Sequence, residues 1–316
     1  MMINIPGTDL TVSSIGLGTV KAGVTYEKAD SLISLFLSLG GNLIDTARVY
    51  SDWIPGETGR SERVVGEAIA RLGVRNKVVL MTKGGHPDIS RGFDQMRPRM
   101  TAEDMRHDLE LSLTALRTDV IDIYVYHRDN EAQSVPEEIE TMENFRKEGK
   151  ILYYACSNWS AARMREADLY CTEHGYRGFI ADQSLLNAGV KHMLPPMDPT
   201  LTIVKDEIYT YHKETPGNVL MPFSSVAEGF FHRLILKGEG GGSYDTEENR
   251  RFAETIRTLQ EKYGATLTQV LLGYFRTIPF TCIPLFDPRD ESQLTDAMKT
   301  EEIPFSIEDY SSVVYE

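Results

Sequence analysis

The stretch Val120-Ile121-Asp122-Ile123-Tyr124-Val125-Tyr126-His127 contains the pattern that decides the fold. It is a short, mostly apolar run, typical of a buried strand, and it ends at a histidine. The preceding segment, Ala102–Leu116, has the spacing of an amphipathic helix and follows Thr101, a residue type that often caps helix N-termini. A helix is therefore followed at once by a buried strand, as in parallel α/β folds.

The same alternation recurs along the whole chain of 316 residues. The predicted strands are Ser14–Gly18, Asn42–Ile44, Val78–Thr82, Val120–Tyr126, Leu152–Cys156, Gly178–Ala181, Val219–Pro222 and Phe280–Pro284. The helical stretches between them include Tyr26–Leu39, Ser61–Leu72, Ala102–Leu116, Glu137–Lys147, Ala161–His174 and Glu247–Tyr263. Eight strands alternating with helices predict an α/β fold, specifically a (β/α)8 TIM barrel.

Other segments refine this prediction. Gly7-Thr8-Asp9 lies between two short alternating runs, which predicts an N-terminal β-hairpin, and we expect extra C-terminal helices. No change in composition marks a boundary, so residues 1–316 are expected to form one domain. The alternative, a doubly wound sheet, usually has a glycine-rich phosphate turn, and Gly16-Leu17-Gly18-Thr19 lacks the third glycine of that motif.

Composition limits the classes of partner. The formal charge is −14 and no block of Lys or Arg stands out, which disfavours nucleic acid and anionic membranes as partners. Neither a basic N-terminus nor a long apolar stretch is present, so we expect a cytoplasmic protein. We separately expect a monomer or a weak homo-oligomer. Cys156, Cys171 and Cys282 lack metal-binding spacing and are odd in number, which argues against structural zinc and a disulfide framework.

Polar residues stand where the predicted strands stop. They are Asp45, Lys83, His127, the pair Ser157-Asn158, and Gln183. Each one alone has an ordinary explanation, such as a helix cap or a solvated side chain. In a parallel barrel, however, all carboxyl ends of the strands face one mouth, so the five positions together indicate a site.

These residue types suit proton transfer. A Lys and an Asp that share a closed mouth are expected to pair, and Tyr50 follows Asp45 closely enough to join them. The Lys83 ammonium is expected to lower the pKa of the Tyr50 phenol toward neutrality, while a His127 N–H polarises a substrate carbonyl. The sequence thus predicts protonation of a developing alkoxide, with Tyr50 as general acid.

Several longer motifs occur in a fixed order along the chain. They are Gly41-Asn42-Leu43-Ile44-Asp45-Thr46-Ala47-Arg48-Val49-Tyr50, Gly59-Arg60-Ser61-Glu62, Thr82-Lys83-Gly84-Gly85, Leu116–Tyr124 with His127-Arg128, and Glu148-Gly149-Lys150-Ile151 leading to Ser157-Asn158-Trp159-Ser160. In these motifs and their spacing the chain resembles the aldo-keto reductase superfamily over nearly its whole length.

The resemblance implies an NAD(P)H-dependent oxidoreductase that reduces an aldehyde or ketone to an alcohol. It implies a catalytic tetrad of Asp45, Tyr50, Lys83 and His127, with a cofactor lying extended across the barrel mouth. The cofactor-binding residues that it implies are Ser157, Asn158 and Gln183 at the carboxamide, Phe223 and Ser224 at the nicotinamide ring, and Arg289 and Gln293 at the adenosine end. Arg289 favours NADP(H), with NAD(H) as the alternative.

The chain departs from the family pattern at four places. Ser51 stands where Gly is common, and Phe223-Ser224-Ser225-Val226 replaces Tyr-Ser-Pro-Leu. Asp287 stands where Gly is expected, and Ala297 replaces the usual Asn. A carboxylate at Asp287 is unfavourable beside a phosphate, which puts the adenosine end in question.

The expected partner is a small carbonyl compound. Trp53 and His86 are the candidate substrate-binding residues, and the irregular segments Gly84–Arg99 and Ala188–Thr200 are expected to wall the pocket. The glycine-rich segment Gly238–Ser243 is a candidate cover for the cofactor.

Two other functions remain open. One is a regulatory or sensor protein that binds the cofactor with little turnover. The other is a metal-dependent barrel hydrolase using His127, Asp45 and His86, although Lys83 would repel a cation there and we expect no metal.

Overall fold

The strands form a closed ring. A computed structural model describes residues 1–88 and 97–315. Its parallel strands are β3 (Gly16–Gly18), β4 (Leu43–Asp45), β5 (Val79–Gly84), β6 (Ile121–Tyr126), β7 (Ile151–Ala155), β8 (Ala181–Asp182), β9 (Val219–Leu220) and β10 (Leu285–Phe286). Six of them pair in the order β10-β3-β4-β5-β6-β7, and β8 pairs with β9. Parallel bridges from Cys156 to Asp182 and from Leu220 to Cys282 join the two sets and close the barrel.

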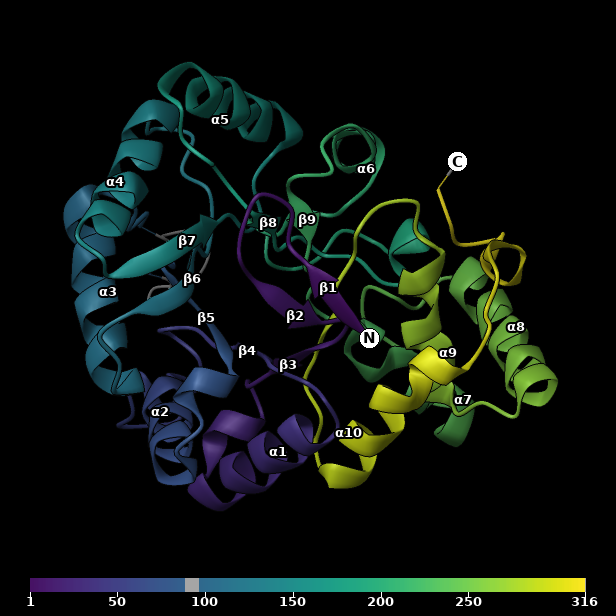
Figure 1. Cartoon of the computed structure of the whole chain (residues 1–316). Helices are drawn as coiled ribbons and strands as arrows, with labels where there is room; N and C mark the ends of the chain where they lie inside the picture. The colour runs from purple at the N-terminus through teal and green to yellow at the C-terminus, as the bar shows by residue number, and fades with distance from the viewer. Residues whose placement is uncertain (89–96, 316) are drawn as a thin grey trace.

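The helices follow the strands along the chain and lie outside the ring, as α1 to α5 do in Figure 1. They are α1 (Tyr26–Ser38), α2 (Arg60–Leu72), α3 (Ala102–Leu116), α4 (Val135–Lys147), α5 (Ala161–His174), α6 (Asp206–Glu214), α7 (Phe230–Lys237), α8 (Glu247–Tyr263), α9 (Leu267–Gly273) and α10 (Glu291–Met298). The predicted (β/α)8 barrel is confirmed. After α10, the described part of the chain up to residue 315 contains two short 3₁₀ segments, Lys299–Glu302 and Ile307–Tyr310.

Side-chain caps fix several helix starts. Thr101 and Ser134 form capping boxes with Asp104 and Glu137 at the starts of α3 and α4.

The predicted eighth strand, Phe280–Pro284, was placed too early, because only Cys282 bridges within it and the regular pairing lies at Leu285–Phe286. Pro284 has no N–H to donate, so the ladder becomes regular only after it.

The N-terminal hairpin pairs β1 (Met2–Asn4) with β2 (Thr11–Ser13) in antiparallel register, as predicted. It lies across the centre of the ring in Figure 1. Ile5, Leu10 and Val12 are buried in one apolar cluster with the residues that fill the barrel interior. Those are Leu43, Val79, Met81, Ile123, Val125, Ala155, Ile180, Ala181, Val219, Met221, Ile283 and Leu285. The hairpin therefore closes the end of the barrel opposite the site.

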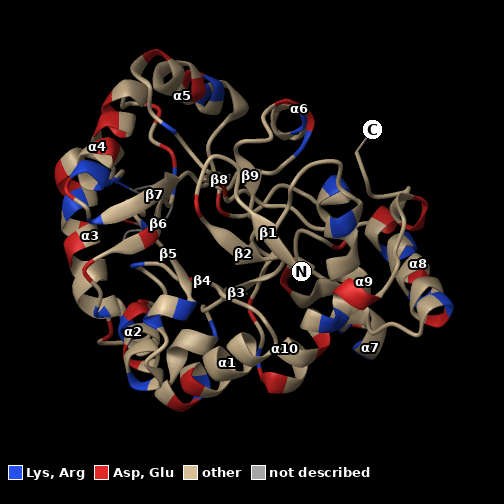
Figure 2. Ribbon diagram, in the orientation of Figure 1, with Lys and Arg blue, Asp and Glu red and all other residues tan. Residues whose placement is uncertain are grey.

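Charged residues of both signs are interspersed along the outer helices (Figure 2). A second, larger apolar cluster lies between the strands and these helices. In residues 1–88 and 97–315, no helix combines the length and the apolar character that a membrane crossing requires.

Candidate active site

Asp45 and Lys83 meet at the mouth because β4 and β5 are parallel neighbours. Lys83 Nζ lies 2.7 and 2.8 Å from the two carboxylate oxygens of Asp45, and it donates to the Thr46 carbonyl at 2.8 Å. Both side chains are buried. A buried ammonium and carboxylate stabilise each other's charges, and the third hydrogen bond fixes the direction of the Lys83 side chain.

Tyr50 comes from the loop after β4 and is only partly buried. Its hydroxyl oxygen lies 3.2 Å from Lys83 Nζ, and the ammonium lies 4.7 Å from the centre of its ring. The next residue, Ser51, has φ of 73°, a left-handed conformation that glycine adopts without strain. This explains why glycine suits that position, and it shows that serine still permits the turn that presents Tyr50.

His127 follows β6, and its ring lies edge-on to two aromatic neighbours at the mouth. The centroid distances are 5.9 Å to Tyr50 and 4.8 Å to His86. His127 is buried, and its Nδ1 makes no hydrogen bond to any described residue. The predicted tetrad is therefore brought together, and His86 lies beside it.

Burial and neighbouring charges set the protonation of this cluster. Burial lowers the pKa of His127 well below its usual value, and the nearby His86, Arg128 and Lys83 act in the same direction. Burial also lowers the pKa of His86, to about 4, with Arg128 contributing. Both imidazoles are therefore neutral at neutral pH, and each carries one N–H.

The tyrosine behaves differently from the sequence-based prediction. Burial raises the pKa of Tyr50 above its ordinary value, and the Asp45 charge adds to this, although Lys83 acts in the opposite direction. For Lys83, burial lowers the pKa, but Asp45 and Tyr50 outweigh it and raise the pKa overall. The expectation that Lys83 lowers the Tyr50 pKa toward neutrality is thus wrong, because desolvation of the phenolate is the larger effect. Tyr50 is thus a protonated phenol beside a charged ammonium.

The three predicted carboxamide-binding residues also lie at the mouth. Gln183 Nε2 donates to Asp45 at 2.9 Å, and no described residue donates to its Oε1. Ser157 Oγ donates to the Gln183 carbonyl at 2.7 Å and accepts from Asn158 Nδ2 at 2.9 Å. Asn158 Oδ1 accepts from the Thr202 N–H at 2.9 Å. Gln183 Oε1 and the second lone pairs of the other two oxygens are left to accept hydrogen bonds from a ligand.

Phe223 and Ser224 lie just beyond β9. Phe223 is partly exposed and bridges to Leu185, which follows β8. The carbonyl of Ser224 accepts from Asn187 at 3.0 Å, so this backbone oxygen already has a hydrogen-bond partner within the protein. The next residue, Ser225, donates to the Leu285 carbonyl at 2.8 Å and ties this loop to β10.

The adenosine-end candidates lie at the start of α10. Arg289 is exposed, and its guanidinium makes no hydrogen bond or ion pair with a described residue. Gln293 Oε1 accepts from the Arg289 backbone N–H at 2.9 Å. Asp287 accepts from the Lys21 N–H at 3.0 Å and lies 3.5 Å from its ammonium. The carboxylate that seemed unfavourable to a phosphate is thus paired with a cation.

The two substrate-side candidates differ. His86 contacts His127, whereas Trp53 is 61% exposed and has no described aromatic partner. His192, in the loop after β8, is bonded to the Ser312 carbonyl at 3.0 Å. Residues 89–96, the middle of the predicted wall Gly84–Arg99, lie outside the described residues.

Arg128 is a feature of the site that sequence reasoning gave no role. Its buried guanidinium donates to the His127 carbonyl at 2.8 Å, to Thr200 at 2.7 Å and to Asp198 at 3.1 Å. It therefore fixes the loop after β8 against the end of β6. Its position directly after the strand-end histidine could have indicated a place at the site. Its partners, some 70 residues away in the chain, could not be predicted from sequence.

Metal chemistry has little support in this geometry. Lys83 occupies both oxygens of Asp45, so the hydrolase alternative loses its carboxylate ligand. Across the described ranges, no three His, Cys, Asp or Glu side chains are grouped to hold a metal ion.

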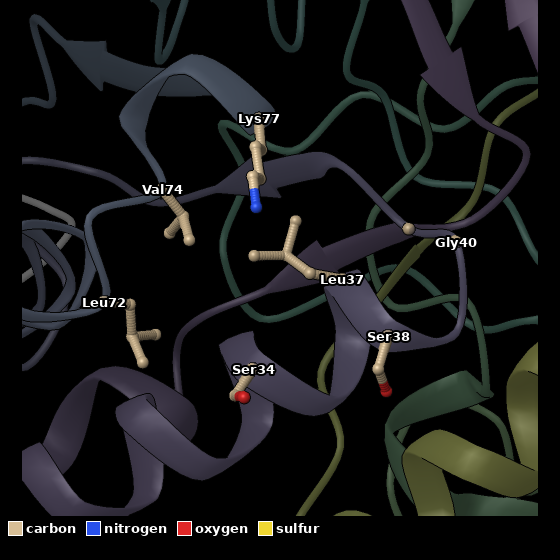
Figure 3. Close-up of a pocket in the computed structure, with 8 residues that line it drawn as sticks. Ser34, Leu37, Ser38, Gly40, Leu72, Val74 and Lys77 are labelled. Atoms are coloured by element: carbon tan, nitrogen blue, oxygen red, sulfur yellow. The ribbon is translucent and has the colours of Figure 1, made fainter.

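A groove of about 550 Å³ lies at the other end of the barrel, where the chain enters β4 and β5 (Figure 3). Its lining residues are Ser34, Leu37, Ser38, Gly40, Gly41, Leu72, Val74 and Lys77. It offers a single ionisable side chain, Lys77, and none of the predicted site residues. We therefore assign the chemistry to the mouth.

Comparisons with known proteins identify the family of this chain. A model of the Aldo/keto reductase family matches residues 14–314. Norsolorinic acid reductase B of Dothistroma septosporum is 28% identical over 288 residues, which cover 85% of this chain and 69% of that protein. The NADP(+) aryl-alcohol dehydrogenase of Phanerodontia chrysosporium is 28% identical over 295 residues, covering 85% and 73%. The solved structure of the thermostable aldo-keto reductase Tm1743, in complex with the inhibitor epalrestat, covers 99% of this chain with a TM-score of 0.74 at 20% identity.

The chain belongs to the aldo/keto reductase family. The resemblance seen in its motifs is confirmed, and the structural neighbour has the same fold. The family, together with the oxidoreductases among the relatives, indicates that this protein is an oxidoreductase.

Proposed function

We propose that this protein reduces an aldehyde or ketone to an alcohol with NADPH, and that Tyr50 is the proton donor. The observation that carries this proposal is the contact of the Tyr50 hydroxyl with a buried ammonium, Lys83, itself held by Asp45. This arrangement supplies a proton and then stabilises the phenolate that remains.

The residues divide the work as follows. Neutral His127 donates its N–H to the substrate oxygen and holds it near the Tyr50 hydroxyl. As charge develops on that oxygen, Tyr50 transfers its proton there, and Lys83 faces the resulting phenolate. Asp45 and the Thr46 carbonyl keep the ammonium aimed, so little reorganisation accompanies the transfer.

A nicotinamide cofactor fits the residues around this centre. When bound, the reduced cofactor supplies the hydride. The free Oε1 of Gln183, with Ser157 and Asn158 beside it, suits the N–H groups of a carboxamide. Phe223, partly exposed past the end of β9, offers a flat apolar surface for the ring.

The phosphate end favours NADPH over NADH. Arg289 is exposed and has no described ionic partner, so its guanidinium is available for a 2′-phosphate. The pairing of Asp287 with Lys21 removes the main objection to this choice. The name of the NADP(+) aryl-alcohol dehydrogenase relative is consistent with it.

The test is loss of absorbance at about 340 nm when the purified protein is mixed with NADPH and a panel of aldehydes, ketones and quinones. We expect turnover with at least one class and weaker activity with NADH. Tight NADPH binding without turnover of any panel member would contradict the proposal and favour a cofactor sensor.

A further inference from the structure

His86 is a second histidine at the mouth that the proton-transfer mechanism does not use. Its ring centroid lies 4.8 Å from that of His127, and the two rings meet edge to face at 73°. His127 is buried, whereas His86 stays partly exposed at the opening. A ligand oxygen held by His127 is therefore followed, toward solvent, by the His86 ring.

The hydrogen bond of His86 fixes its tautomer. Its Nδ1 lies 2.8 Å from the Pro87 carbonyl oxygen, which can only accept, so the proton is on Nδ1. In the neutral ring, Nε2 then carries a lone pair and is an acceptor. Among the described residues, none donates a hydrogen bond to Nε2, so this acceptor is available to a ligand there.

Burial and charge at this position favour the neutral ring. Burial, and after it the guanidinium of Arg128, act against protonation of His86, while the hydrogen bond to Pro87 and the charge of Asp198, which is paired with Arg128, act for it. An acceptor with no proton to give selects a ligand donor such as a hydroxyl, and it offers nothing to a carboxylate or a second carbonyl.

We propose that His86 determines substrate specificity by accepting, at Nε2, a hydrogen bond from a hydroxyl on the carbon next to the reacting carbonyl. Two rings whose centroids lie 4.8 Å apart can each hydrogen-bond one of two neighbouring oxygens of a single ligand, such as oxygens on adjacent carbons. The substrate class is thus α-hydroxy aldehydes and α-hydroxy ketones. This inference rests on the carbonyl reduction proposed above.

Lactaldehyde and propanal form a matched pair of probes, because they differ only by that hydroxyl. We expect kcat/KM with NADPH to favour lactaldehyde by about tenfold in the wild-type protein, as for one neutral hydrogen bond. In His86→Leu we expect the two kcat/KM values to become about equal, chiefly because KM for lactaldehyde rises. His86→Gln retains an acceptor oxygen and should restore part of the preference for lactaldehyde. His107→Leu, which changes an exposed histidine of α3, is the control and should keep the wild-type ratio.

An independent measurement needs no turnover. In 15N-histidine NMR spectra of the wild-type protein at pH 7, we expect the His86 signals of a neutral ring protonated at Nδ1. A ring protonated at Nε2 would overturn the proposal, as would equal kcat/KM for the two aldehydes or a ratio unchanged in His86→Leu. Failure of both aldehydes and of the wider panel to oxidise NADPH would instead show that the proposed function is wrong, and the inference would fall with it.

Discussion

Lys83 carries a buried ammonium, and its contacts indicate which group beside it can exchange a proton. Asp45 accepts two of its contacts and the Thr46 carbonyl another, which leaves the phenol of Tyr50 as the neighbour that can change charge. We therefore expect the cation to stay charged, which fits the proposal that the phenol is the group that exchanges a proton.

The raised pKa of Tyr50 leads to a prediction about pH. Because the pKa lies above its ordinary value of 10.0, the Tyr50 phenol stays largely protonated up to about pH 9. We expect kcat for reduction to be flat from about pH 6 to about pH 9, and kcat for alcohol oxidation, which needs the phenolate, to rise over the same interval. Steady-state rates in both directions check this. A fall in the rate of reduction with a midpoint below about pH 8 would show that another acid acts.

Contacts between helices and strands stabilise the mouth, and Glu62 makes one of these contacts. This buried carboxyl group on α2 accepts from the Thr82 hydroxyl on β5 at 2.6 Å, next to Lys83. Its Oε2 has no partner among the described residues, and burial raises its pKa to about 7. The group therefore favours the folded state when it is protonated.

The sign of its effect on stability follows from the direction of the shift. The contribution of Glu62 is fully present below the unfolded pKa of about 4.5, and it is lost as pH rises through about 7. We expect Glu62→Gln to remove up to about 3 kcal/mol of pH dependence from the free energy of unfolding over that interval. Urea denaturation at several pH values measures it, with the exposed Glu166→Gln on α5 as control. Identical pH profiles for Glu62→Gln and wild type would contradict this account.

At the start of α10, Arg289 should separate the two cofactors. Arg289→Ala removes a cation that can face a 2′-phosphate, so we expect Kd for NADPH to rise at least about tenfold and Kd for NADH to change much less. Fluorescence titration with both cofactors checks this, and Arg251→Ala, an exposed arginine on α8, is the control. Equal losses for the two cofactors would show that Arg289 does not bind the 2′-phosphate.

Some features of these helices, strands and loops could be predicted from the sequence, and others could not. The bounds of α3 and α5 were predicted to the residue, since caps such as Thr101 and Ser160 are local signals. The strand-end residues Asp45, Lys83 and His127 were also readable, because a buried run that stops at a polar residue is a local pattern. The sequence did not predict the hydrogen bond from Thr202 to Asn158 or those from Arg128 to the loop after β8. They depend on how loops far apart in sequence pack together.

Closure of the whole barrel brings these strand ends to one opening. On either side of the β8–β9 pair the ring is completed by isolated bridges, at Cys156 and Leu220, rather than by regular ladders, so the interior packing has to support it. The hairpin contributes to that packing through Ile5, which is 1% exposed.

We therefore expect Ile5→Ala to lower the free energy of unfolding by about 2–5 kcal/mol. The surrounding strands cannot close a cavity at the base of the barrel without shifting. Urea denaturation measures the loss, and the half-exposed Met2→Ala on β1 is the control. A loss no larger than that of the control would mean that the hairpin merely covers the barrel.

The proposed reduction depends on the phenol at the centre of this mouth. The most direct test compares Tyr50→Phe with wild type in two measurements, single-turnover reduction of the best aldehyde and NADPH affinity by fluorescence titration. We predict a fall in the rate of the chemical step by about 10²–10⁴-fold, with Kd for NADPH nearly unchanged. A reduction rate within a few fold of wild type would contradict the assignment of Tyr50 as the proton donor.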